Sequence, residues 1–187
     1  WDKISVSCPK ATEEEKLAMN RLATAMVFTA QGIPFFLSGE EFARTKPIEG
    51  TDEVCENSYN MPFYTNVMRY DRLEKYSDLN EYYKGIIAFR KAHEGLRLGT
   101  AEEVQKAVHF IDGLPKNVVA FTVTTAEETI FVAYNANKEA VTIDLPEAAA
   151  WNICIDNDKA SKDALRTLTE ADKAVEVQGV ACLVAVK

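Results

Sequence analysis

A long apolar stretch near the start of the chain follows a strong helix-start signal. Thr12 is a good N-cap residue, and Glu15 three positions later completes a capping-box motif. Most residues from position 17 onward are apolar, and Gly32 stands where glycine usually marks the end of a helix. The pattern therefore predicts a helix over 12–30 that neighbouring elements cover on much of its surface.

The apolar pattern then changes period twice before residue 95. The run Ile-Pro-Phe-Phe-Leu at 33–37 does not alternate, which predicts a strand buried on both faces. The connection over 40–77 lacks periodicity but is rich in aromatic residues, which favours an ordered functional loop over disorder. Asp78 and Glu81 make a second capping box, and apolar residues at helical spacing predict a helix over 78–93.

The second half of the chain shows strand-like alternation with turn signals. Strands are predicted at 105–111, 117–124, 129–135, 139–145, 151–156, 173–178 and 180–186. Period-two patterns indicate one buried and one exposed face, and short strands at this spacing favour a small antiparallel sandwich. We therefore predict an α+β fold in two parts, with helix, strand and helix in 1–97 and an all-β domain in 98–187.

Composition narrows the classes of function. Of the 187 residues, 47% are apolar, which is ordinary for a packed globular protein. The net charge of −8 argues against nucleic acid as a partner, because such binding needs a basic surface. No apolar run approaches the roughly 18 residues of a membrane span, so we expect no membrane partner either.

Cysteine and histidine placement argues against a metal site. The four cysteines share no C-x-x-C spacing, and only two histidines could join them, so we expect neither a metal nor a cofactor. Cys154 and Cys182 fall in apolar strand patterns, which predicts small buried hydrophobic side chains. His93 and His109 are predicted to be structural or surface residues.

Carboxylates are the other candidates for chemistry, because a pair of them cleaves glycosidic bonds. Glu40 and Glu41 follow the predicted strand, but neighbours on an extended chain point to opposite faces, so the two cannot flank one bond. We expect a carboxylate here to accept hydrogen bonds from the loop backbone. The arginine, asparagine and aromatic residues from Arg44 to Tyr70 are typical of a ligand surface.

Several motifs occur in a fixed order along the chain. They are Trp1-Asp2-Lys3, Gly32-Ile-Pro-Phe35, Gly39-Glu-Glu-Phe42, Arg44-Thr-Lys46, Asn57-Ser-Tyr59, Asn66, Ala133-Tyr-Asn-Ala-Asn137, Leu145-Pro146 and Trp151. In this order and spacing the chain resembles the C-terminal part of type I pullulanases, debranching enzymes of the α-amylase superfamily. The resemblance covers nearly the whole chain.

The resemblance implies a (β/α)₈ hydrolase that cleaves α-1,6 branch points in pullulan, glycogen or starch dextrins with retention of configuration. In that family the catalytic carboxylates come from the fourth, fifth and seventh barrel strands. By resemblance this chain holds the seventh helix, eighth strand, eighth helix and β domain. We therefore expect this chain to be a portion of a longer enzyme whose sequence continues upstream of Trp1. We expect this portion to lack the catalytic carboxylates and to be inactive alone.

The same resemblance suggests where an α-glucan partner would bind. Arg44, Asn57, Tyr59 and Asn60 are the best candidates for lining a sugar cleft, although a role in ordering the loop fits them equally. Phe63 and the pair Arg69-Tyr70 depart from the family pattern, which leaves substrate preference open.

Two alternatives stay open at this stage. A non-catalytic carbohydrate-binding module would explain the β domain but not the helices and strand of 1–97. A structural or assembly role would follow if the apolar surface of 12–30 and 33–37 were exposed, because such patches drive self-association.

Overall fold

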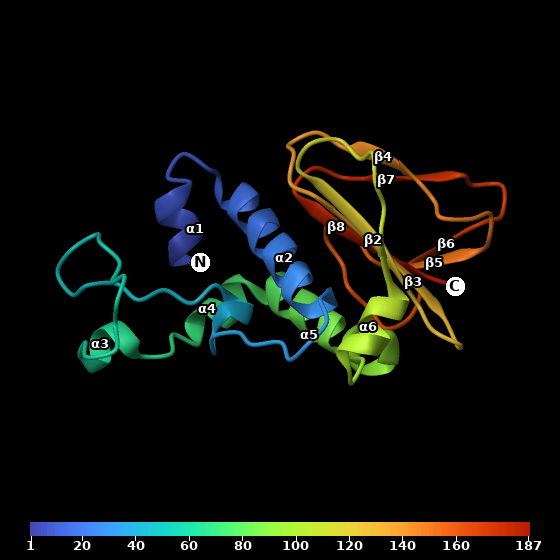
Figure 1. The fold of residues 1–187 in the computed structure, drawn as a ribbon. Coiled ribbons are helices and arrows are strands. Elements are labelled where there is room, and N and C mark those ends of the chain that lie inside the picture. Colours follow the sequence, from blue (N-terminus) through green and yellow to red (C-terminus); the bar gives the residue numbers. More distant parts are fainter.

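The computed structural model describes residues 1–187 (Figure 1). The helices are α1 (Asp2–Ser7), α2 (Glu13–Thr29), α3 (Phe63–Asn66), α4 (Asp71–Lys75), α5 (Ser77–Ala92) and α6 (Ala101–Ala107), with 3₁₀ turns η1 (Glu40–Phe42) and η2 (Glu94–Arg97). The strands are β1 (Val108–Phe110), β2 (Val118–Thr124), β3 (Thr129–Asn135), β4 (Val141–Asp144), β5 (Trp151–Ile155), β6 (Arg166–Leu168), β7 (Ala174–Val177) and β8 (Ala181–Val186). None of the helices has the length and apolar character required to cross a lipid bilayer.

Helix α2 begins at the predicted capping box, and its C-terminal end is held by hydrogen bonds from Arg90 that were not predicted. The Thr12 main-chain amide donates to Glu15 Oε2 at 2.8 Å, and the Glu15 amide donates to Thr12 Oγ1 at 3.1 Å, which completes the capping box. At the other end, the buried guanidinium of Arg90 donates to the carbonyls of Phe28, Ala30 and Gly32 at 2.5–2.7 Å. Arg90 of α5 therefore satisfies carbonyls that a helix end leaves open, and its cation faces the negative end of the helix dipole.

The second half of the chain forms two antiparallel sheets. Six strands pair in the order β1-β2-β3-β8-β5-β6, and β4 pairs with β7 in a separate two-stranded sheet. A cluster of 12 buried residues, centred on Trp151 and Phe131, fills the space between the two sheets. The predicted antiparallel sandwich is confirmed in this part of the chain.

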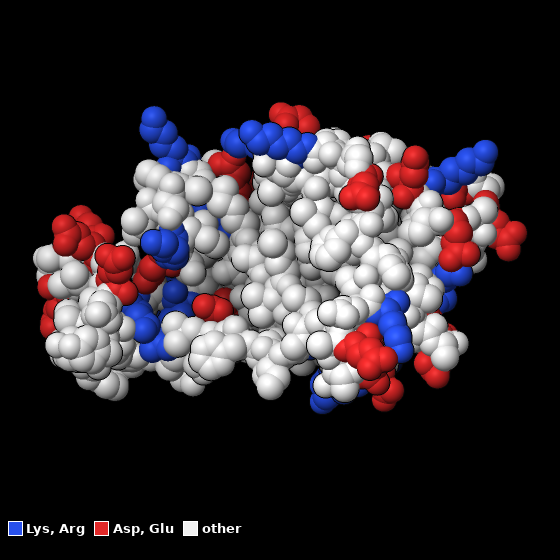
Figure 2. Space-filling view, in the orientation of Figure 1, with Lys and Arg blue, Asp and Glu red and all other residues white.

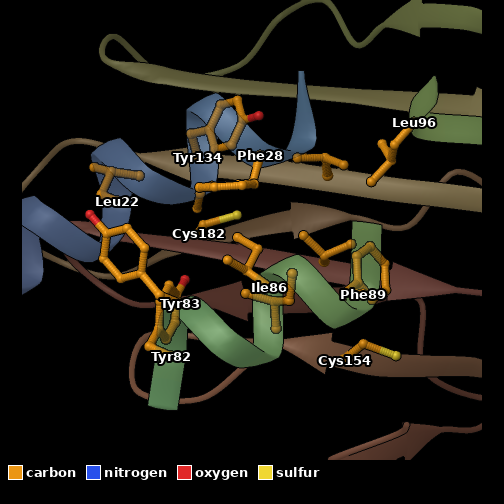
Figure 3. Close-up of a cluster of buried hydrophobic side chains, with 14 of the residues drawn as sticks. Leu22, Phe28, Tyr82, Tyr83, Ile86, Phe89, Leu96, Tyr134, Cys154 and Cys182 are labelled. Atoms are coloured by element: carbon orange, nitrogen blue, oxygen red, sulfur yellow. The ribbon is translucent and has the colours of Figure 1, made fainter. Parts of the chain in front are cut away.

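Helix α2 contacts β8 and β3 on the other face of the six-stranded sheet, and α5 shares a buried cluster with these strands, so the fold has three layers (Figure 1). A cluster of 21 buried residues joins Phe28 of α2 and Phe89 of α5 to Tyr134 of β3 and Cys182 of β8 (Figure 3). The central strands β3 and β8 are consequently buried on both faces. The pattern of one buried and one exposed face does not extend to these two strands, because the helices cover their second face.

The strand predicted at 33–37 is also wrong. These residues lie outside all strands, and the side chains of Ile33 and Phe35 are 97% and 90% exposed. A strand needs a neighbouring strand for its main-chain hydrogen bonds. No strand of this chain pairs with 33–37, since both sheets are built from residues after position 107.

Three further differences concern short elements. Residues 101–107 form helix α6 with a complete capping box between Thr100 and Glu103, so only Val108–Phe110 of the strand predicted at 105–111 is present. The three-residue strand β6 was not predicted. The capping box expected from Asp78 and Glu81 does not form, because α5 begins at Ser77 without a side-chain cap.

The cysteines are free thiols, and two of them are core residues. Cys154 and Cys182 are buried, as the strand pattern predicted. Burial raises the pKa of the Cys154 thiol to about 11 and raises the pKa of Cys182 further, because a thiolate is poorly solvated in the core. Both therefore remain protonated and act as small hydrophobic side chains.

Candidate functional site

The loop after α2 is organised around Arg44, which packs on Gly39. Gly39 has a φ of +97°, and a Cβ atom there would lie 2.8 Å from Arg44 Cδ, so both the backbone and the space require glycine. The Arg44 guanidinium donates to the carbonyl of Ser38 at 2.9 Å and to the carbonyl of Asn66 at 2.5 Å. Arg44 thus links the start of the loop to the end of helix α3.

A second set of hydrogen bonds fixes the turn from Asn57 to Met61. The Asn66 carboxamide donates to the carbonyls of Ser58 and Met61 at 2.8 and 3.0 Å. The ammonium of Lys46 donates to the hydroxyl of buried Ser58 at 2.7 Å. Lys46, Ser58 and Asn66 belong to the sequence motifs, but they were not predicted to be site residues. Their presence in those motifs is the one feature of the sequence that pointed to this network.

The same turn presents polar and aromatic side chains to solvent. Asn57 and Asn60 are exposed, and Tyr59 is 83% exposed. The structure therefore brings three of the four predicted site residues together on one turn, with the fourth, Arg44, bonded beneath it through Asn66. An exposed Asn-rich turn with one aromatic ring can donate and accept hydrogen bonds and can stack on an apolar ligand face.

Two carboxylates near this loop are engaged with the backbone. Glu41 Oε2 accepts a hydrogen bond from the Gly39 amide at 2.8 Å, which confirms the role expected for one member of the Glu40–Glu41 pair. Asp2 of α1 accepts from the Lys46 amide at 2.7 Å and so ties the first helix to the loop. These carboxylates order the chain.

The two histidines lie far from this turn in the sequence. His93 follows α5, where its Nδ1 lies 2.5 Å from Glu128 Oε2 and its ring packs on Phe89. His109 is an exposed residue of β1. Both positions agree with the predicted structural and surface roles, and neither histidine is paired with a nucleophile.

An apolar groove of about 430 Å³ lies beside the loop, between α2 and the segment 35–37. Its lining includes Trp1, Val27, Phe28, Phe35 and Leu37. In the view of Figure 2, the middle of the molecule over α2 is largely free of charged residues. The groove and the exposed segment therefore form one apolar face, here called the open face (Val27, Ile33, Phe35, Leu37).

Unsatisfied polar atoms also gather in this part of the chain. Four buried side-chain atoms lack a hydrogen-bond partner, and three of them belong to the loop region: Arg44 Nε, Thr65 Oγ1 and Arg72 Nη2. A buried donor without a partner costs about 1–3 kcal/mol.

Comparison with known proteins identifies relatives along the whole chain. Residues 104–159 match the family model described as "Pullulanase, all-beta domain". The chain is 30% identical to the Bacillus subtilis (strain 168) pullulanase over 98% of its own length, and to the maize chloroplastic isoamylase SU1 over 93%. It spans about a quarter of the length of these curated relatives (25% and 24%).

Solved structures agree with the sequence relatives. A pullulanase from Bacillus acidopullulyticus superposes with a TM-score of 0.88 at 33% identity, covering 100% of this chain and 22% of that one. A Paenibacillus barengoltzii pullulanase in complex with maltohexaose and alpha-cyclodextrin gives a TM-score of 0.81 at 37% identity, covering 100% of this chain and 27% of that one. The chain is therefore homologous to the pullulanases and isoamylases along nearly its whole length.

Proposed function

We propose that this chain is the C-terminal portion of a retaining glycoside hydrolase that cleaves α-1,6 branch points in pullulan, glycogen or starch dextrins. The observation that carries the proposal is the agreement of the entire chain with about a fifth of a solved pullulanase at 33% identity. Residues 1–97 would belong to the (β/α)₈ barrel, and residues 98–187 would form the all-β domain. The catalytic carboxylates would come from the remainder of the protein.

The open face supports assignment of residues 1–97 to a barrel wall. Val27, Ile33, Phe35 and Leu37 present apolar side chains that a longer protein would cover. The segment 33–37 has no strand partner in this chain and would supply the eighth barrel strand. Burying each such side chain is worth about 1.5–3 kcal/mol, so the chain on its own would tend to self-associate through this face.

The turn at Asn57–Asn60 is the proposed contact with the α-glucan. Asn57 and Asn60 would bond to sugar hydroxyls, and the exposed ring of Tyr59 would stack on the apolar face of a sugar. Arg44 would hold the loop in place through its hydrogen bonds to the carbonyls of Ser38 and Asn66. Similar proteins have been solved with maltose, maltotriose and maltotetraose, which supports a glucan as the ligand class.

A structural role for the all-β part is the second candidate. The buried cluster shared by α2, α5, β3 and β8 supports this role, because the sheet supplies one wall of the core on which the helices pack. The β domain would then stabilise the barrel end of the protein. Binding of carbohydrate by the β domain itself has less support, because Phe110 is the one large aromatic exposed on its strands.

The 187-residue chain alone is expected to hydrolyse no pullulan. The catalytic pair of a retaining glycosidase stands about 5 Å apart, and by the proposal above both of its carboxylates would come from the remainder of the protein. Release of reducing ends from pullulan measures the activity, and a commercial pullulanase serves as the positive control. Turnover that saturates with substrate and follows the purified chain through chromatography would overturn this assignment.

A further inference from the structure

We propose that Asn66 is a positioning residue that holds the turn 57–61 in the conformation that binds glucan. This inference rests on the proposed function, since it concerns the same turn. Asn66 is partly buried, and its side chain makes no hydrogen bond to the side chains of Asn57, Tyr59 or Asn60. Its carboxamide nitrogen instead spans the turn, because it donates to the carbonyls of Ser58 and Met61 at 2.8 and 3.0 Å.

The chemistry of Asn66 explains why this position needs an amide. One NH₂ group supplies two donors, and both go to carbonyls on the two sides of Tyr59 and Asn60. A carboxylate of the same shape has no donor and would repel both carbonyl oxygens. An alanine would remove the donors without adding charge.

The surroundings hold Asn66 itself in place. Its main-chain oxygen, at the end of α3, accepts from Arg44 at 2.5 Å. Lys46 binds the same turn through the Ser58 hydroxyl at 2.7 Å. In Asn66→Asp the carboxylate could instead turn toward Arg44 or Lys46. The carbonyls of Ser58 and Met61 would still lose their hydrogen bonds, so the turn would be weakened in this conformation as well.

The functional consequence is preorganisation. A turn that is fixed before the ligand arrives binds without the entropy cost of ordering its side chains. Loss of the Asn66 bonds should therefore weaken glucan binding without removing any group that touches the sugar. The effect should be confined to the turn, because Asn66 is only partly buried and lies outside both hydrophobic clusters.

Hydrogen exchange on the full chain tests the positioning role without any ligand. The Met61 amide, which donates to the Ser58 carbonyl at 3.1 Å, is expected to exchange about tenfold faster or more in Asn66→Ala, and faster still in Asn66→Asp, as local opening becomes easier. Asn80→Asp, on helix α5, is the matched control for the change of charge and should leave the turn unaffected. A space-filling role would reverse the order, because aspartate keeps the shape of asparagine. That reversed order, or unchanged exchange in both variants, would overturn the proposal.

Titration with maltotetraose then separates this proposal from the proposed function. If wild-type chain binds, Asn66→Ala should bind about tenfold more weakly, and saturating sugar should return protection of the Met61 amide to the wild-type level. Weaker binding with no change in free-state exchange would mark Asn66 as a direct contact and contradict positioning. If wild-type chain does not bind while exchange still responds to Asn66→Ala, the sugar assignment of the turn fails and the role of Asn66 in holding it stands.

Discussion

Gly85→Ala is expected to destabilise the fold by about 1–3 kcal/mol or more, although alanine is the better helix former. Gly85 lies within α5, where an alanine at an exposed site would gain about 1 kcal/mol over glycine. Here a Cβ atom would lie 1.8 Å from the carbonyl oxygen of Ala160 and 2.5 Å from its carbonyl carbon. The loop between β5 and β6 would have to move away from the helix, so the packing loss outweighs the gain in propensity.

Denaturant unfolding of Gly85→Ala, compared with two further variants, measures this effect. Gly99→Ala is the matched control, since its new Cβ would meet only the Glu103 carboxylate at 3.6 Å, an ordinary contact. Adding Ala160→Gly to Gly85→Ala should not restore stability, because the clash is with the main chain. A Gly85→Ala protein as stable as wild type would show that α5 and the β5–β6 loop do not approach as closely as described.

Phe89→Ala is expected to cost about 3–5 kcal/mol and to weaken the helices and the sheet together. Phe89 is fully buried in the cluster that α2 and α5 share with β3 and β8 (Figure 3). Its ring also packs on His93, which is bonded to Glu128 of the β2–β3 connection. Removing the ring therefore leaves a cavity at the junction of the two parts of the chain.

The cooperativity of unfolding distinguishes a shared core from two independent ones. Helix content by circular dichroism and the fluorescence of Trp151, which lies between the two sheets, should report the same shifted midpoint in Phe89→Ala. The wild type and each variant carry Trp1→Phe as well, so that Trp151 is the single tryptophan and the fluorescence reports on it alone. Phe110→Ala, at a site 67% exposed, is the control and should change stability little. A Trp151 transition that keeps its wild-type midpoint while the helices melt early would mean that the two parts fold separately.

The elements that the sequence predicts well are those with complete local signals. The capping box at Thr12 and the apolar run behind it define α2, and it is observed within one residue of the prediction. The same signature at Thr100 and Glu103 also forms, yet the apolar positions after it favoured a strand there. In that segment the run Ala-Glu-Glu-Val-Gln-Lys-Ala consists mostly of good helix formers, and local propensity outweighs the strand-like spacing.

Features that depend on distant parts of the chain could not be predicted from the sequence. The pattern at 33–37 indicates a buried strand, but the strand can form only beside partners that this chain does not supply. Burial of β3 and β8 on both faces depends on helices α2 (Glu13–Thr29) and α5 (Ser77–Ala92), which lie far earlier in the chain. In the candidate site, the motifs identified the right loop. They could not separate Asn66, which bonds to main-chain carbonyls, from Tyr59, which faces solvent, because the path of the backbone decides both.

Placing this chain within a complete pullulanase tests the proposed function most directly. In a chimaera, this chain would replace the matched quarter of the Bacillus subtilis pullulanase, which is 30% identical to it. Release of reducing ends from pullulan is the measurement, with the isolated chain and the unmodified pullulanase assayed beside it. The account predicts hydrolysis by the chimaera and none by the isolated chain. A chimaera that elutes as a single folded species but releases no sugar, or an isolated chain that turns pullulan over, would contradict it.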